Sequence, residues 1–262
     1  MTAVTKMRPP MRFTKILFNV PILAVLLFAL SGCVWLRLLE AKNQLADFDR
    51  NVRVSIDEGY FHLDFLNPVL LSEDFRYLTK LHPSRIEKLP AGYRWSVDFR
   101  QMDTGDRPGR TIIFRMTFNQ ENKLSGWDFS PVFLELAPAT FLEASIRSLG
   151  KGKVDEGRRQ LKVAAGDLPK LAAAPPNRKR ILEVLGPPAE ESTKDGMKVY
   201  TYRFEAEAAP VEVGQDYEKR RVAVAKLYFN PVTDDLIRMS SRFVGLKLAI
   251  DYRKLTQLAS PG

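Results

Sequence analysis

One cysteine carries the most distinctive chemistry available to this chain. Cys33 is the only cysteine among the 262 residues, and it directly follows Leu30, Ser31 and Gly32. A thiolate is a strong nucleophile that can be alkylated, and the small side chains of Ser31 and Gly32 leave a peptidase room to reach the bond before it. The four residues therefore make the sulfur of Cys33 a candidate for covalent modification, next to a bond that a peptidase could reach.

The residues before Cys33 are arranged like an export signal. Four basic residues precede residues 16–30, a run whose only polar member is Asn19, and no acidic residue occurs before Glu40. This arrangement resembles bacterial lipoprotein signal peptides, and the resemblance covers residues 1–33. It implies that residues 1–32 are removed and that Cys33 carries diacylglycerol and palmitate. We expect no other cofactor.

A single-pass, uncleaved membrane anchor is the alternative. Residues 16–36 would form an apolar span long enough for a hydrocarbon core of about 30 Å. Pro21 and the small residues before the thiol favour cleavage instead. Either anchor places the remainder in the cell envelope, outside the cytoplasm. Val34, where an aspartate would favour inner-membrane retention, favours the outer membrane with the body in the periplasm over the inner membrane.

The composition predicts a folded body behind the anchor. The chain is 45% hydrophobic and 27% charged, which is typical of globular proteins. Its formal charge of +9 includes four basic residues of the signal, so the mature chain carries +5. Residues 151–180 alone hold nine basic and three acidic residues, which leaves the rest of the mature chain nearly neutral.

The basic segment is the candidate binding patch. An exported protein does not routinely meet nucleic acid, and no aromatic residue is interleaved to stack bases. Anionic lipid, lipopolysaccharide phosphates or other envelope proteins fit better as partners, whereas a merely solvated helix face is the plain alternative. The residues proposed for this patch are Lys151, Lys153, Arg158, Arg159 and Lys162.

Hydrophobic periodicity and capping residues predict an α+β fold. We expect an amphipathic tether helix over residues 33–50, a hairpin over 52–65, and helices that begin at Ser72, Thr140 and Asn177, together with a basic helix over 153–165 and a short C-terminal helix. The expected later strands cover residues 93–100, 111–119, 123–130, 197–205, 220–230 and 235–244.

Two parts of the chain match each other in element order and in residues. Trp95, Val97 and Phe99 alternate as Tyr200, Tyr202 and Phe204 do, and residues 116–119 match residues 227–230. The match predicts two tandem modules, each with short helices packed on an antiparallel meander. The modules would cover residues 51–150 and 177–262, and an Ala/Pro-rich connection ending the basic stretch 151–176 would join them.

The second module also resembles the small SmpA/OmlA-type lipoproteins that accompany outer-membrane protein assembly. The similar features are the helix of residues 181–187, the aromatic strand Tyr200-Thr201-Tyr202, and the strand ending in Phe229-Asn230. The resemblance implies helices packed on a three-stranded antiparallel sheet. The long segment 206–219 and the doubling of the module depart from that family's pattern.

Residues suited to catalysis are scarce. His62 and His82 are the only histidines, so we expect no metal site, and Gly150-Lys151-Gly152-Lys153 lacks the spacing of a phosphate-binding loop. Hydrolysis by an anchored enzyme would need carboxylates such as Asp98, Asp128, Glu205 and Glu207 to converge in a cleft.

We therefore expect a non-enzymatic, lipid-anchored envelope protein with a binding or scaffold role. The main alternative is a carrier of lipid or another apolar ligand, in which aromatic strand residues line a cavity rather than a core. The residues concerned are Trp95, Phe114, Phe118, Trp127 and Phe129.

Overall fold

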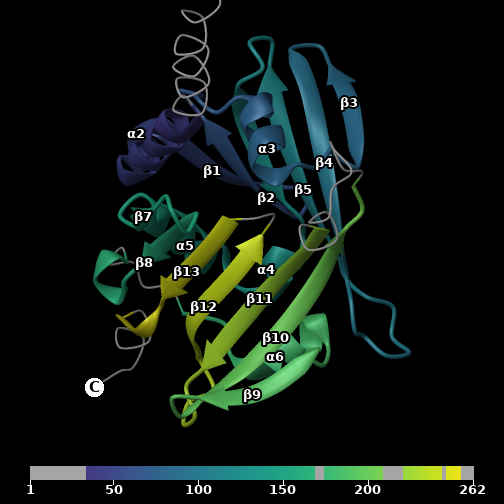
Figure 1. Cartoon of the computed structure of the whole chain (residues 1–262), viewed down its shortest axis with the longest axis vertical. Helices are drawn as coiled ribbons and strands as arrows, with labels where there is room; N and C mark the ends of the chain where they lie inside the picture. The colour runs from purple at the N-terminus through teal and green to yellow at the C-terminus, as the bar shows by residue number, and fades with distance from the viewer. Residues whose placement is uncertain (1–33, 169–173, 209–220, 244–245, 255–262) are drawn as a thin grey trace, which may run out of the picture.

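One twisted sheet of 13 strands organises the molecule. The computed structural model describes residues 34–168, 174–208, 221–243 and 246–254. Within them the strands run in the order β1-β2-β6-β5-β4-β10-β11-β12-β13-β8-β7, and β3 and β9 pair with β4 and β10 (Figure 1). Helices pack on this mostly antiparallel sheet, so the expected α+β class is confirmed.

The first half of the sheet follows the alternation in the sequence. Its strands are β1 (Val52–Asp57), β2 (Tyr60–Phe65), β3 (Arg85–Leu89), β4 (Gly92–Gln101), β5 (Thr111–Asn119) and β6 (Leu124–Phe129). The predicted hairpin over residues 52–65 is confirmed, with Val52 opposite Phe65. Its turn contains Glu58 and Gly59, both with positive φ, as a tight hairpin turn requires.

The second half contains β9 (Glu190–Lys194), β10 (Met197–Ala206), β11 (Val222–Phe229), β12 (Leu236–Phe243) and β13 (Leu246–Asp251). The three central strands lie where we predicted strands. The predicted C-terminal helix is wrong for residues 246–251, which form β13 instead, because Leu246, Leu248 and Ile250 alternate and pair with β12. Residues 209–220 lie outside the described residues.

Among the described residues, the two halves of the sheet are joined by three residue pairs between β4 and β10. Phe99 lies opposite Ala206, Arg100 opposite Glu205, and Gln101 opposite Phe204. Farther along the same edges, Gly92–Ser96 of β4 pair with β3, and Met197–Thr201 of β10 pair with β9. The strands predicted for the two modules thus belong to one continuous sheet.

Equivalent backbone contacts recur on both sides of this junction. The Leu124 amide donates to the Leu70 carbonyl at 2.8 Å, and the Leu236 amide donates to the Pro176 carbonyl at 2.9 Å. The side-chain oxygens of Asn119 and Asn230 each accept two amide hydrogens from the turn that follows. Each backbone contact holds the residues before a helix beside the strand that follows the asparagine turn, and the two tandem modules stay a prediction.

The helices are α2 (Phe48–Asn51), α3 (Ser72–Thr79), α4 (Val132–Leu136), α5 (Ala139–Leu149) and α6 (Arg178–Leu185). Asn177 caps α6 by accepting the Arg180 amide at 2.8 Å, and Gly186 ends it at φ 74°, as predicted. The other two predicted caps are wrong. Ser72 is the first residue of α3 and does not cap it; Leu71 occupies the cap position, and its amide donates to the Asp74 side chain. Thr140 lies inside α5, which begins at Ala139, directly after Pro138.

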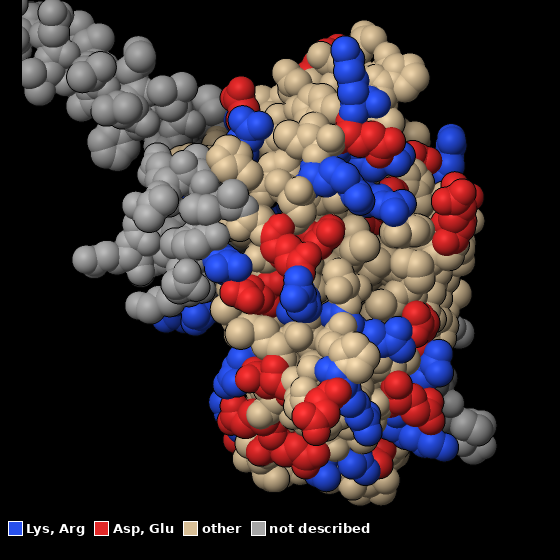
Figure 2. Space-filling view, turned by 90° about the vertical axis from the view of Figure 1, so that its right-hand side faces the viewer, with Lys and Arg blue, Asp and Glu red and all other residues tan. Residues whose placement is uncertain are grey.

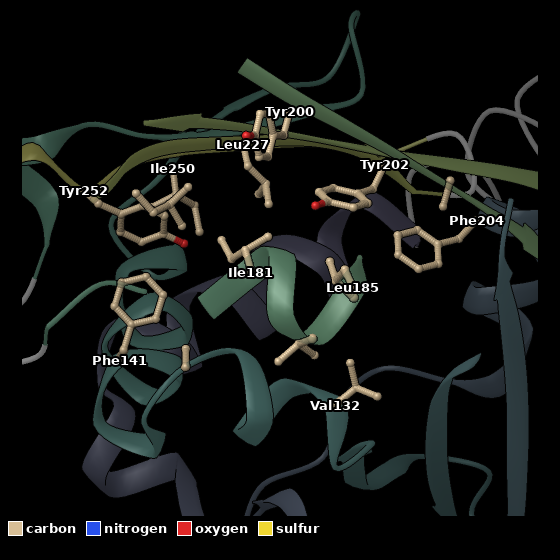
Figure 3. Packing of buried hydrophobic residues seen from close by; sticks show 14 of the residues in the cluster. Val132, Phe141, Ile181, Leu185, Tyr200, Tyr202, Phe204, Leu227, Ile250 and Tyr252 are labelled. Atoms are coloured by element: carbon tan, nitrogen blue, oxygen red, sulfur yellow. The ribbon is translucent and has the colours of Figure 1, made fainter. Parts of the chain in front are cut away.

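The main core lies between β10–β13 and the helices behind them. Ile181 and Leu185 of α6 point toward Tyr202 and its neighbours on the sheet (Figure 3). Near the other end of this layer, the ring centroid of Phe141 in α5 lies 4.8 Å from that of Tyr252. These contacts orient one whole face of β10–β13 toward the helices.

The aromatic residues considered as a cavity lining pack against one another instead. Ring centroids lie 4.9 Å apart for Trp95 and Phe118, and 5.1 Å apart for Trp127 and Phe129. Phe114 contacts both Trp127 and Phe129 edge to face. Such mutual contacts are typical of a packed core.

The basic helix predicted over residues 153–165 is wrong. Residues 153–155 form β7 (Lys153–Asp155), and residues 160–163 form β8 (Gln160–Val163), which pairs with β7 and runs parallel to β13. Val154 lies opposite Leu161, and Val163 is buried, so the apolar residues alternate with the charged ones. The many charges obscured this period of two.

The expected tether helix is packed on the body. Residues 34–46 are helical, a turn at Asp47 interrupts them, and α2 follows. Arg37 binds the buried Asp74 of α3, with Nε to Oδ2 at 2.7 Å. A Cβ atom on Gly150, at the end of α5, would lie only 2.2 Å from the Ala46 amide nitrogen, so this glycine permits the close approach. None of the described helices is both long and apolar enough to cross a bilayer.

Candidate functional site

The strands β10–β13 carry a polar face opposite the core. Because side chains alternate along a strand, Tyr200, Tyr202 and Phe204 face the helices while Thr201 and Arg203 face the other way. No described helix covers this second face, which is turned toward the viewer in Figure 1. A groove of about 470 Å³ lies on it, and its polar lining residues are Gln160, Glu190, Thr201, Arg203, Lys226, Ser240, Ser241, Arg242 and Lys247.

Strand register sets hydroxyl and cationic side chains beside each other across the groove. Thr201 of β10 lies opposite Lys226 of β11, which lies opposite Ser240 of β12. Neighbouring strands are about 4.8 Å apart, and paired residues point to the same face. Thr201, Lys226 and Ser240 therefore form one row of hydrogen-bond donors.

A second row carries guanidinium and ammonium groups. Arg203 lies opposite Val224, Val224 opposite Arg242, and Arg242 opposite Lys247. The row ends at Gln160 of β8, which pairs with Lys247. The two rows surround the same hollow with side chains from five strands.

The groove has an excess of positive charge. Arg203 is compensated, because it lies 3.4 Å from Asp103 and 3.9 Å from Glu190. Lys226, Arg242 and Lys247 are exposed and form no ion pair within the described part of the chain. Uncompensated cations around a concave surface attract anions.

Thr201 is the buried polar group of the groove. The residue is 2% exposed, and its hydroxyl finds no hydrogen-bond partner among the described residues. A buried hydroxyl without a partner destabilises the fold by about 1–3 kcal/mol. Because Thr201 lines the groove, a polar ligand that reaches this hydroxyl would supply the missing partner.

The basic patch inferred from the sequence adjoins this groove in part. Lys151, Lys153, Arg158, Arg159 and Lys162 are all exposed and lie on or beside the β7–β8 hairpin. Lys153 lies opposite Lys162, which pairs with Ala249 on the same face as Ser240. Arg158 instead pairs with Asp155 at 3.6 Å, in the turn of the hairpin. The structure thus brings Lys153 and Lys162 to the groove's face of the sheet.

Sequence reasoning missed Thr201, Lys226, Arg242 and Lys247. Each occupies a polar position in an alternating strand, and that alternation was the available signal. The four strand positions meet only through long-range pairing. Leu30, Ser31, Gly32 and Cys33, the predicted processing and lipidation residues, lie outside the described residues.

Another side of the surface has mixed charges. Figure 2 shows the side that lies to the right in Figure 1, where β3 and β4 lie, and acidic and basic residues are interspersed across it. Arg94 is 3.5 Å from Glu87, and Arg100 pairs with Glu207. Such local compensation contrasts with the cations of the groove.

His62 lies on the polar face of the first half of the sheet, as expected, and is held between two carboxylates. Its Nδ1 bonds Asp128, and its Nε2 lies 2.9 Å from Asp64. The hydrogen bond that the ring donates to Asp128 is the largest cause that raises the pKa of His62 to about 9. The ring is consequently protonated at neutral pH, which makes it a poor general base.

The candidate carboxylates are drawn mainly into separate contacts. Asp128 binds His62, Glu205 lies 3.2 Å from Arg221, and Glu207 pairs with Arg100. Burial is the main cause that raises the pKa of Asp98, and the nearby charge of Glu207 raises it further. Among the described residues, no three His, Cys, Asp or Glu side chains are grouped so that they could hold a metal ion.

Replacing His62 with glutamine should make stability less dependent on pH. The folded pKa of about 9 exceeds the unfolded value of 6.5, so the stabilisation is complete below pH 6.5 and is lost as pH rises toward 9. We expect His62→Gln to lower the free energy of unfolding by about 1–2 kcal/mol at pH 6, discounted for partial exposure, and by less at pH 9. Urea unfolding at both pH values measures this, and an equal loss at both would contradict it.

Comparison with known proteins adds no functional assignment. No protein-family model matches the chain, and the searches of curated proteins and of solved structures found no match.

Proposed function

We propose that this protein is a non-enzymatic, lipid-anchored component of the cell envelope whose body binds other envelope components. In this proposal Cys33 carries the lipid at the outer membrane and the body lies in the periplasm. The basic groove on the open face of β10–β13 is the binding surface, and the neighbouring Lys153 and Lys162 extend its positive charge.

One observation carries the binding role. Lys226, Arg242 and Lys247 converge around a hollow without ion-pair partners in the described chain, while charges on the side shown in Figure 2 are interspersed. Exposed cations held close together repel one another, and an anionic partner relieves that repulsion. An anionic lipid and an acidic surface of an envelope protein both meet this requirement. The SmpA/OmlA-type resemblance of the second module supports a role beside other envelope proteins.

Photocrosslinking in intact cells tests the groove as the binding surface. A photoreactive amino acid replacing Ser240 lies in the groove, whereas one replacing Lys179 lies on α6, across the sheet, where the side chain is 86% exposed. We expect adducts from position 240 and few from position 179. The adducts at position 240 should decrease when Arg242 and Lys247 are changed to glutamine.

Two outcomes would contradict the proposal. Adducts that form equally from both positions would show no preference for the groove. Adducts from position 240 that are unaffected by Arg242→Gln and Lys247→Gln would show that the positive charge has no part in binding.

A further inference from the structure

We propose that the groove binds a phosphate monoester, which deepens the proposed function and rests on the groove being the binding surface. A phosphate monoester is a compact group with a charge of about −1.5 to −2 at neutral pH. The same dianionic phosphate group occurs in soluble phosphates and on lipid headgroups, including the phosphorylated sugars of envelope glycolipids.

The charge of the groove matches such a dianion. Three cations lack an ion-pair partner within the described chain, namely Lys226, Arg242 and Lys247. Glu190 also lines the groove, but it lies 3.9 Å from Arg203, which compensates its charge. A dianion would therefore leave the groove close to neutral, whereas a monoanion would leave most of the excess charge in place.

The kinds of donor in the groove also suit a phosphate better than a carboxylate. Lys226 and Ser240 occupy neighbouring strands in one row, and Arg242 and Lys247 occupy the next row on the same face. A carboxylate is best bound by two parallel N–H bonds from one arginine, whereas lysines bind phosphate as point charges from several directions. Two lysines and one arginine around a hollow favour phosphate on this basis.

The Thr201 hydroxyl favours a polar ligand for a reason that does not depend on charge. Its hydroxyl is buried and unpartnered while the residue lines the groove. Valine has nearly the same shape and would remove the unsatisfied donor, so threonine lowers the stability of the ligand-free fold. A hydrogen bond from this hydroxyl to a phosphate oxygen gives the residue a role in binding.

Thr201→Val therefore has two opposite expected effects. It should raise the thermal midpoint of the ligand-free protein, because the unsatisfied hydroxyl is lost, and it should weaken phosphate binding about tenfold, because a charge-assisted hydrogen bond is lost. A merely structural threonine would not combine a gain of stability with a loss of affinity.

Titration calorimetry with inorganic phosphate tests the proposal on the full chain purified in detergent. The Lys226→Gln/Arg242→Gln variant should bind at least 30-fold more weakly than the wild type. Lys179→Gln, which removes an exposed cation from α6, is the matched control and should bind normally. Acetate should compete poorly with phosphate for the groove. Vesicles of phosphatidylcholine with and without phosphatidic acid then distinguish a lipid headgroup from a free phosphate as the source.

The proposal is overturned if the wild type shows no saturable phosphate binding, if acetate competes equally, or if Thr201→Val and Lys226→Gln/Arg242→Gln bind phosphate as Lys179→Gln does. Those results would leave the crosslinking from position 240 unaffected, so the failure of the phosphate assignment is distinguishable from failure of the groove as a binding surface.

Discussion

Incorporation of radiolabelled palmitate into the protein is expected to fall to background when Cys33 is replaced by serine. Cys33 is the only thiol of the chain, and a serine hydroxyl does not form the thioether to which the diacylglycerol is attached. The effect should be complete rather than graded, which makes it the largest expected from a single substitution. Labelling of cells followed by immunoprecipitation of the protein measures it.

Ser31→Ala is the matched control for this experiment. Alanine keeps a small side chain before the cleavage site and leaves Cys33 in place, so labelling should persist. Labelling that survives Cys33→Ser would contradict lipidation at this residue. An absence of label from the wild type as well would favour the uncleaved, single-pass anchor.

Replacing Phe229 with alanine is expected to produce the second-largest effect. Phe229 is 0% exposed, and its ring lies 5.2 Å from that of Tyr200 beneath β10 and β11. Truncation of a fully buried phenylalanine lowers the free energy of unfolding by about 3–5 kcal/mol. Because one sheet runs through both halves, the first half should lose stability together with the second.

The positions of the tryptophans make this coupling measurable. Trp35, Trp95 and Trp127 all lie in the first half, so tryptophan fluorescence reports on that half, whereas circular dichroism reports on the whole fold. Phe229→Ala should shift the urea midpoint of both signals equally. Val232→Ala, at a residue that is 89% exposed in the neighbouring turn, should shift neither. A fluorescence midpoint that stays in place while the dichroism midpoint falls would show that the halves unfold independently.

The sequence pattern was sufficient for strands that have one apolar and one polar face. The hairpin over residues 52–65 and the strands β4–β6 and β10–β12 were predicted because half of their side chains pack on a core. The sequence pattern did not predict β9, because its residues Glu190–Lys194 are all exposed and none is apolar. This strand forms because β10 offers it free backbone hydrogen-bonding groups, and such groups leave no trace in side-chain patterning.

The sequence also predicted the part of the candidate site whose residues are close together in the chain, and missed the part that is assembled by strand pairing. The basic residues near 151–162 stand together in the sequence and were visible as a charge cluster, although their hairpin was mistaken for a helix. Thr201, Lys226 and Lys247 are distant in sequence, and only the register of β10–β13 brings them to one groove. A buried hydroxyl without a partner is likewise visible only in three dimensions.

The lipid anchor fixes where the protein works, and the envelope location decides which anions the groove can meet. The intact mass of the protein extracted from membranes tests the anchor most directly. We predict a chain that begins at Cys33, lacks residues 1–32 and carries added mass that corresponds to diacylglycerol and an acyl chain. A mass equal to the unmodified sequence from residue 1 to residue 262 would contradict this account.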